Sequence, residues 1–292
     1  MAGLHVDRYE YTGAGGSGVP LLLIHGWGMH GGMWSGAAKR LAQNFRVMAV
    51  DLPGHGYSQF RSPARGESEA REAKPDGGEG SDLATLSRER ERVLGFLDSI
   101  VDELSAQFDG SLAVCGWSLG GQVALRWALR YPQQVGRLVM VASTPCFVRL
   151  DDWKYALSVE ILEEFAVNLQ HHYALTLKRF LALQVRGGEQ EREWLTVLRD
   201  ALFSRGEPDL SALQSGLDIL RSCDLRGALP EVKQAVLVLV GERDTLIPQQ
   251  ASQYLASRIP KGQLATIKGA AHAPFLSHPD EFVNHIVNFL NE

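Results

Sequence analysis

The run Gly116-Trp117-Ser118-Leu119-Gly120 places one serine where the nucleophile of an acyl transfer would stand. The apolar stretch 111–116 before it is typical of a buried strand, and residues 121–131 after it repeat apolar side chains at helical spacing. A serine on the sharp turn between such a strand and such a helix exposes its hydroxyl at the edge of a sheet. The flanking glycines fit this turn because side chains there would collide with neighbouring elements. We therefore predict that Ser118 is a catalytic nucleophile.

A serine hydroxyl is a weak nucleophile and needs an adjacent base that is itself oriented by a carboxylate. Among the nine histidines, His272 comes just after the last expected strand, at the same sheet edge as Ser118. Asp244 follows the preceding strand directly, and Glu242 is the alternative acid. We interpret six further histidines as surface or structural residues: His25, His55, His171, His172, His278 and His285. The order Ser118, Asp244, His272 is the order of such a triad on an open α/β sheet.

The negative oxygen that forms when serine attacks an ester needs hydrogen-bond donors. We expect one donor to be the backbone N–H of Leu119, directly after the nucleophile. The second should come from the turn His25-Gly26-Trp27-Gly28 after the first strand, where Trp27 occupies the position of the donating N–H. One such donor contributes about 10²- to 10³-fold in rate.

Strand-like and helix-like segments alternate along the chain. Apolar strands are expected at 20–25, 46–51, 111–116, 137–143, 235–241 and 263–268. Helices are expected at about 33–43, 83–107 and 279–290, and directly after Ser118. Continuous apolar strands that alternate with helices indicate a mostly parallel sheet covered on both faces. The fold class is therefore α/β, and the triad residues follow three of its strands.

Two segments interrupt this alternation. Residues 59–81 are rich in Arg, Glu, Ser, Gly and Pro, and they predict a flexible polar loop within the core domain. Residues 145–224 form amphipathic helices and predict a helical cap inserted into a core made of 1–144 and 225–292. Such a cap would cover the carboxyl ends of the strands, where open α/β sheets bind their ligands.

Composition limits the class of protein. Hydrophobic residues make up 45% and charged residues 22% of 292 residues, which is ordinary for a globular protein. The net charge of −5 gives no general attraction to nucleic acid or to anionic membranes, and neither a signal peptide nor a membrane span is expected. Three scattered cysteines predict a protein of the reducing cytoplasm. No residue spacing indicates a metal site or a dinucleotide fingerprint, so we expect no cofactor.

Four stretches together give the pattern of the α/β-hydrolase superfamily, which the chain resembles over nearly its whole length. They are residues 25–28, 51–58, 116–121 and 271–275. Further stretches resemble one family within it, the pimeloyl-[acyl-carrier protein] methyl ester esterases of bacterial biotin synthesis. They are residues 116–121, 141–147, 179–184, 216–220 and 270–279. The second set is the more discriminating, because it includes cap residues, which vary most among such enzymes.

This resemblance implies an α/β-hydrolase fold with a helical cap, and a triad of Ser118, Asp244 and His272 next to an oxyanion site at Trp27 and Leu119. It also implies that five consecutive cap residues line the acyl channel: Phe180, Leu181, Ala182, Leu183 and Gln184. The family removes a methyl group from a pimeloyl methyl ester on acyl carrier protein. The expected reaction is therefore hydrolysis of that ester through an acyl-enzyme.

The resemblance further implies that basic residues of the cap bind the acidic carrier protein. Arg179 and Arg192 fit that role, and Lys178, Arg186 and Arg199 are close in sequence. The cap as a whole is not basic, because several glutamates alternate with these residues. The long polar segment 59–81 departs from the compact form of the family. The resemblance therefore predicts the triad but not the surroundings of the pocket entrance.

Other functions remain open on the sequence alone. A generic short-chain carboxylesterase would share every catalytic residue and differ only in its cap. A serine-dependent carbon–carbon bond hydrolase of the same superfamily would need a different acyl pocket. A hydrolase fold kept as a binding protein usually lacks a triad member, whereas all three are present here. Dehalogenases and related epoxide hydrolases are disfavoured, because their nucleophile is an aspartate where this chain has Ser118.

Overall fold

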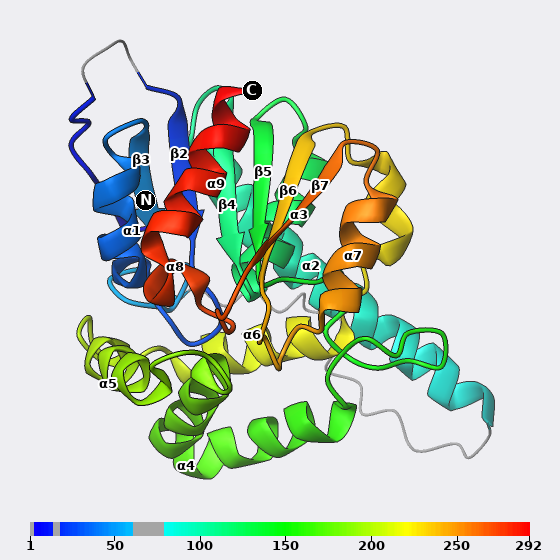
Figure 1. Cartoon of the computed structure of the whole chain (residues 1–292). Helices are drawn as coiled ribbons and strands as arrows, with labels where there is room; N and C mark the ends of the chain where they lie inside the picture. Colours follow the sequence, from blue (N-terminus) through cyan, green and yellow to red (C-terminus); the bar gives the residue numbers. More distant parts are fainter. Residues whose placement is uncertain (1–2, 14–17, 61–78) are drawn as a thin grey trace.

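The structure, a computed structural model, describes residues 3–13, 18–60 and 79–292. In these residues, seven strands form one sheet in the order β1-β3-β2-β4-β5-β6-β7 (Figure 1). Their bounds are β1 Val6–Arg8, β2 Pro20–Ile24, β3 Arg46–Val50, β4 Leu112–Trp117, β5 Val135–Val141, β6 Ala235–Gly241 and β7 Gly262–Ile267. Only β1 pairs antiparallel, with β3, and every other neighbouring pair is parallel. The predicted α/β class with a mostly parallel sheet is confirmed.

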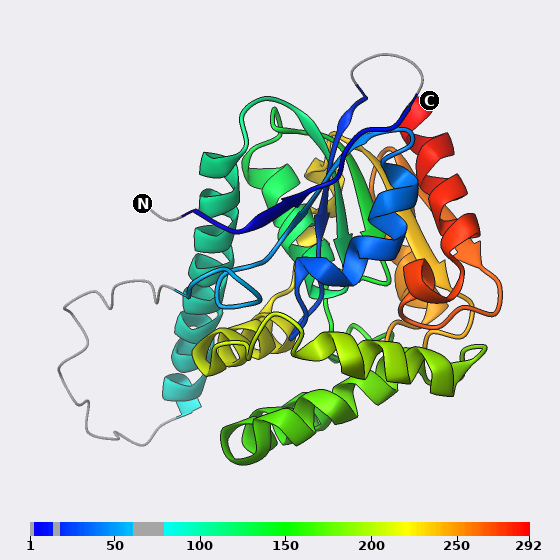
Figure 2. The same cartoon turned by 90° about the vertical axis from the view of Figure 1, so that its left-hand side faces the viewer.

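Helices cover both faces of the sheet, which is why its central strands are continuous apolar runs. All six residues of β4 are buried. α1 (Ser35–Leu41) and α9 (Pro279–Asn291) pack together on one face, and α2 (Glu79–Gln107) and α3 (Leu119–Arg130) pack together on the other (Figures 1 and 2). α7 (Gln249–Arg258) packs against β6 and β7. Three short elements pack beside these helices: η1 (Gly31–Trp34), η2 (Arg226–Glu231) and α8 (Pro274–Ser277).

An aromatic cluster fills the core beneath the carboxyl end of β4. The rings of Trp34 and Phe275 lie 4.2 Å apart between centroids, and those of Trp117 and Phe275 lie 4.9 Å apart. Phe282 of α9 joins the cluster at 6.0 Å from Phe275. These rings are fully buried and pack η1, β4, α8 and α9 against one another. Through Trp117, the cluster fixes the end of β4 just before Ser118. Through Phe275, it fixes α8, which follows His272.

Three helices lie across the carboxyl ends of the strands, below the sheet in Figure 1. They are α4 (Val159–Val185), α5 (Glu191–Leu202) and α6 (Leu210–Ser222). α4 bends at His172, whose backbone leaves the helical region with φ −143° and ψ 48°. The chain enters and leaves this helical region side by side, because Cys146 pairs with Asp224 in an isolated antiparallel bridge. All three helices lie within the range 145–224 that the sequence predicts as the cap.

The predicted polar loop at 59–81 falls mostly outside the described residues, which omit 61–78. The helix after it begins at Glu79, four residues before the expected start at Leu83, so residues 79–81 of the predicted loop are helical. Among the described helices, none is long and apolar enough to cross a bilayer.

Candidate active site

Ser118 lies on the turn between β4 and α3 with φ 54° and ψ −119°, a conformation that costs a non-glycine residue about 1–3 kcal/mol. The surrounding backbone holds the strained residue in place. Its N–H donates to the carbonyl of Val141 (2.9 Å), and its own carbonyl accepts from Gly121 N–H (2.9 Å) and Ser143 Oγ (2.8 Å). This strand–turn–helix geometry is the one that the sequence predicts for the nucleophile.

The glycines on either side of the turn are required by close backbone contacts. A Cβ on Gly116 would lie 2.2 Å from the carbonyl oxygen of Gly120. A Cβ on Gly120 would lie 2.5 Å from the carbonyl oxygens of Ile24 and His25. Because these atoms belong to the backbone, they cannot move aside without displacing β2 or α3.

Asp244 and His272 come together at the carboxyl ends of β6 and β7. The Nδ1 of His272 donates to Asp244 Oδ2 at 2.9 Å, and both side chains are almost completely buried. The other carboxylate oxygen of Asp244 accepts from the N–H groups of Leu246 and Ile247, each at 2.9 Å. The carboxylate therefore holds the imidazole in the tautomer whose Nε2 is free to accept a proton.

The second ring nitrogen of His272, Nε2, is the atom that would take the proton of the nucleophile. His272 Nε2 is buried and has no hydrogen-bond partner among the residues that the structure describes. Trp117 Nε1 donates to the backbone carbonyl of His272 at 2.9 Å, which ties this histidine to the residue before Ser118. A buried nitrogen without a hydrogen-bond partner is uncommon in a folded protein, and catalytic sites are among the places where it occurs. Glu242, the alternative acid, instead accepts from Gly269 N–H at 3.0 Å.

The loop after β2 is fixed by His25. The N–H of Leu52 donates to His25 Nε2 (2.9 Å), so the ring proton is on Nδ1, which donates to the carbonyl of Gly26 (2.8 Å). Met29 N–H donates to the same carbonyl (3.2 Å). In a trans peptide the C=O and the next N–H point in opposite directions, so the N–H of Trp27 points away from these two donors. The predicted role of His25 as a brace for this loop is confirmed.

Both expected oxyanion donors lie beside Ser118. A Cβ on Gly26 would be 3.2 Å from Ser118 Cβ, so the Gly26–Trp27 peptide packs directly against the nucleophile. Leu119 is the first residue of α3, and the N–H groups of a first helical turn have no acceptor within the helix. The N–H groups of Trp27 and Leu119 therefore stay the predicted oxyanion donors.

Helical geometry separates the five cap residues that the resemblance assigns to the acyl channel. Phe180 stacks edge-on against Trp27 at 4.9 Å, and Gln184, one turn later, is buried with its Oε1 unpaired. The backbone carbonyl of Gln184 accepts from His272 N–H (3.0 Å). Leu183 lines a cleft of about 250 Å³ between the two halves of α4. Leu181 is fully buried and Ala182 partly so. Acyl binding stays a prediction, and the geometry favours Phe180 and Gln184.

Arg179 and Arg192 are exposed on α4 and α5. Arg179 lines the same cleft as Leu183, opposite Glu164. Among the residues that the structure describes, neither arginine forms an ion pair. Both guanidinium groups are therefore available to a partner, and their predicted role in docking stays a prediction.

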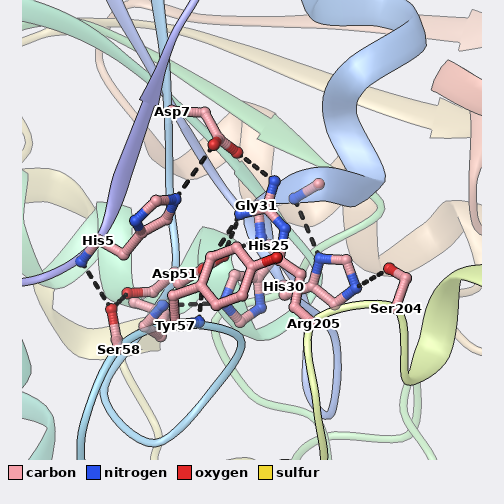
Figure 3. A network of polar contacts seen from close by, with 12 residues as sticks. His5, Asp7, His25, His30, Gly31, Asp51, Tyr57, Ser58, Ser204 and Arg205 are labelled. Carbon is pink, nitrogen blue, oxygen red and sulfur yellow. Dashed lines mark hydrogen bonds and ion pairs between the residues drawn. The ribbon is translucent and has the colours of Figure 1, made fainter.

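A polar network next to the loop is not anticipated by the sequence interpretation (Figure 3). Its centre is Asp51, which is fully buried and accepts from Gly31 N–H (2.6 Å) and Tyr57 N–H (2.9 Å). Arg205, from the connection between α5 and α6, pairs with this carboxylate at 3.2 Å. The position of Asp51 in the motif 51–58 signals a structural role. No pattern around Arg205 signals its partner.

Three histidines around this loop predict how stability depends on pH. Burial, the largest cause, lowers the pKa of His25, His30 and His55 below the ordinary value. They stay neutral in the folded protein, whereas in the unfolded chain they gain protons below about pH 6.5. The unfolded state then binds more protons, so the free energy of unfolding falls, by up to about 1.4 kcal/mol per pH unit for each histidine.

Urea unfolding at about pH 7 and about pH 5.5 measures this loss. Carboxylates contribute little in that window, because in the unfolded chain they titrate near pH 4. A free energy of unfolding that is unchanged or higher at the lower pH would contradict the lowered pKa values.

Comparison with known proteins agrees with this geometry. A sequence profile of the alpha/beta hydrolase family matches residues 21–285, and the chain belongs to this family. It is 38% identical to the pimeloyl-[acyl-carrier protein] methyl ester esterase of Nitrosomonas europaea, over 97% of this chain and 98% of that protein. It is also 38% identical to the protein of the same name from Xanthomonas campestris pv. campestris, over 94% of this chain and 96% of that protein.

Among solved structures, an esterase from Exiguobacterium antarcticum superposes on 99% of this chain and 96% of its own, with a TM-score of 0.74 at 19% identity. This likeness shows the fold, and the predicted α/β-hydrolase architecture is confirmed.

Proposed function

We propose that this protein is a serine carboxylesterase that hydrolyses the methyl ester of pimeloyl-[acyl-carrier protein] and releases methanol in biotin synthesis. The buried Asp244–His272 pair at the edge where Ser118 stands is the observation that carries the reaction class. The substrate is supported by relatives of that name, which are 34–38% identical over nearly the whole chain. Complementation of a biotin-requiring strain that lacks its own esterase tests this function, and failure to restore growth would contradict it.

The reaction proceeds by two acyl transfers. His272 Nε2 takes the proton of the Ser118 hydroxyl as its oxygen attacks the ester carbonyl, and the N–H groups of Trp27 and Leu119 stabilise the oxyanion. Collapse of this intermediate breaks the bond to the methoxy oxygen, which takes the proton from the His272 imidazolium and leaves as methanol. Water, activated by the same imidazole, then attacks the acyl-enzyme and releases the free carboxylic acid. Asp244 stabilises the imidazolium at each stage.

The acyl carrier protein docks on the cap. Carrier proteins of this kind are acidic, and Arg179 and Arg192 lie on exposed helix surfaces without an ion pair to any residue in the described ranges. Charged contacts of this type mainly raise the rate of encounter and fix the register of docking, and salt screens them. The carrier would thereby present its acyl chain to the buried site beneath α4.

Reversing the charge of both cap arginines is expected to weaken use of the carrier-bound ester and to spare a small free ester. The double variant Arg179→Glu with Arg192→Glu is expected to raise KM for the carrier-bound ester about tenfold, because it repels the acidic carrier. Turnover of a small free methyl ester, which does not touch this surface, should stay within about twofold of wild type. Added salt should weaken wild-type use of the carrier substrate more than that of the variant.

The matched control is Lys39→Glu with Lys261→Glu, which changes the net charge equally at exposed positions of the core. It should leave KM for the carrier-bound ester close to the wild-type value. Equal losses on both substrates in the arginine variant would mean that these residues serve folding or the pocket. No loss on either would place docking elsewhere or favour a free ester, as expected of a generic carboxylesterase.

A further inference from the structure

The oxyanion loop, residues 25–31, is held from the side of the cap. We call residues 201–213 the cap connection. They comprise the end of α5, the start of α6 and the segment between the two helices. The indole Nε1 of Trp27 donates to the carbonyl of Leu213 at 2.8 Å. Asp209 N–H donates to Gly54 O (2.8 Å) in the turn that packs beside the loop. The residue whose N–H meets the oxyanion is thus anchored through its side chain to the cap.

His30 makes a second link between the loop and the cap connection. Its Nδ1 accepts from Gly32 N–H (3.1 Å), so the ring proton is on Nε2. That nitrogen donates to the carbonyl of Ala201 at 2.8 Å, and Ser204 Oγ lies 3.2 Å from it. His30 also caps η1, which begins at the end of the loop. The imidazole therefore joins the last turn of α5 to the start of η1.

Arg205 completes the connection through Asp51 (Figure 3). Its guanidinium lies 3.2 Å from both oxygens of the Asp51 carboxylate and also pairs with Asp7 of β1. It covers the ring of Tyr57, with 5.2 Å between Cζ and the ring centroid. Asp51 in turn accepts the N–H of Gly31, the last residue of the oxyanion loop. One cationic side chain of the cap thus neutralises a buried carboxylate that fixes the loop.

Loss of this cation would leave Asp51 and Asp7 without the charge between them. A buried carboxylate that loses its charged partner is strongly destabilised, so the local structure rearranges to admit water or to move the carboxylate outward. Either change weakens the hydrogen bond from Gly31 N–H to Asp51, one of the contacts that fix the loop carrying Trp27. Displacement of a catalytic group by about 1 Å can reduce a rate by about 10²-fold.

On the basis of the proposed esterase function, we propose that Arg205 is a positioning residue. Through Asp51 and Gly31, it holds the oxyanion loop where the Trp27 N–H can meet the oxyanion. Because Arg205 belongs to the cap, the same contact couples the seating of the cap to the assembly of the oxyanion site. Arg205 is not expected to touch the substrate.

The test compares Arg205→Gln and Arg205→Lys on a short chromogenic ester, p-nitrophenyl acetate. Arg205→Gln should lower kcat about tenfold and leave KM within about twofold, since oxyanion contacts act in the transition state. Arg205→Lys keeps the charge but not the planar fork, so its kcat should be intermediate. Phenylboronic acid forms a tetrahedral adduct with a catalytic serine, and its Ki should rise in proportion to the loss in kcat/KM.

Arg126→Gln is the matched control. Arg126 forms a two-point ion pair with Asp98 (2.6 and 2.9 Å) between α3 and α2, away from the loop. This variant should lower the melting temperature and leave kcat and the boronate Ki unchanged. Wild-type kcat and Ki in folded Arg205→Gln would overturn the proposal, as would a loss of kcat without weaker boronate binding. Absence of ester turnover in the wild type would instead contradict the proposed function, while the Kd of phenylboronic acid, measured by calorimetry on the wild type and Arg205→Gln, would still report on Arg205.

Discussion

Replacement of Ser118 by alanine is expected to lower ester turnover by roughly 10⁴- to 10⁶-fold, because the covalent acyl-enzyme can no longer form. The substitution removes one hydroxyl oxygen and leaves the backbone contacts to Val141, Gly121 and Ser143 intact. The melting temperature should therefore stay close to that of the wild type. Steady-state hydrolysis of p-nitrophenyl acetate, together with a thermal melt of the same sample, provides the measurement.

A folded Ser118→Ala protein that keeps more than about one hundredth of wild-type turnover would contradict the assignment of the nucleophile. A residual turnover of roughly 10⁻⁴ to 10⁻⁶ of the wild-type rate is expected, since the oxyanion donors and substrate binding still act without the nucleophile.

Replacement of His272 by alanine is expected to cost nearly as much as loss of Ser118, because members of one catalytic unit do not act additively. Its Nε2 is buried and has no hydrogen-bond partner within the described part of the chain, and Asp244 fixes its tautomer. His278 is the matched control, since it lies six positions later, is partly exposed and contacts Ser277 Oγ at 2.8 Å. His278→Ala should stay within about twofold of wild type in turnover of the same ester.

Equal damage from His272→Ala and His278→Ala would show that the base has been misassigned. If only His272→Ala were impaired but its melting temperature also collapsed, His272→Gln would separate the loss of the base from the loss of packing. The account predicts that the glutamine variant folds and remains inactive.

The sheet and the Asp244–His272 pair can be predicted from the sequence for a physical reason. Parallel strands buried on both faces are continuous apolar runs, as in 20–24 and 235–241, and such runs stand out from helical spacing. β1 was missed, because its three residues form no apolar run. Its pairing with β3 makes it a strand, and Asp7 on it pairs with a residue nearly 200 positions later.

Within the site, short sequence motifs predict the geometry of the residues inside them. They do not predict contacts between residues that are far apart in the sequence. The glycines around Ser118 report a steric requirement that can be seen from sequence alone, and the structure shows the same backbone contacts. The assignment of five consecutive cap residues to one channel stays a prediction. Helical periodicity places Phe180, Leu183 and Gln184 toward one face of α4 and turns Leu181 and Ala182 away from it. The bend at His172 and the link from Arg205 to Asp51 depend on tertiary packing, for which short-range spacing carries no signal.

The most direct test of the account is conversion of pimeloyl-[acyl-carrier protein] methyl ester by the purified protein, followed by mass spectrometry of the intact carrier. The account predicts that the carrier-bound ester becomes the free acid with release of methanol, and that the Ser118→Ala protein leaves it unchanged. A small free ester that is hydrolysed while the carrier-bound ester stays intact would contradict the proposed substrate.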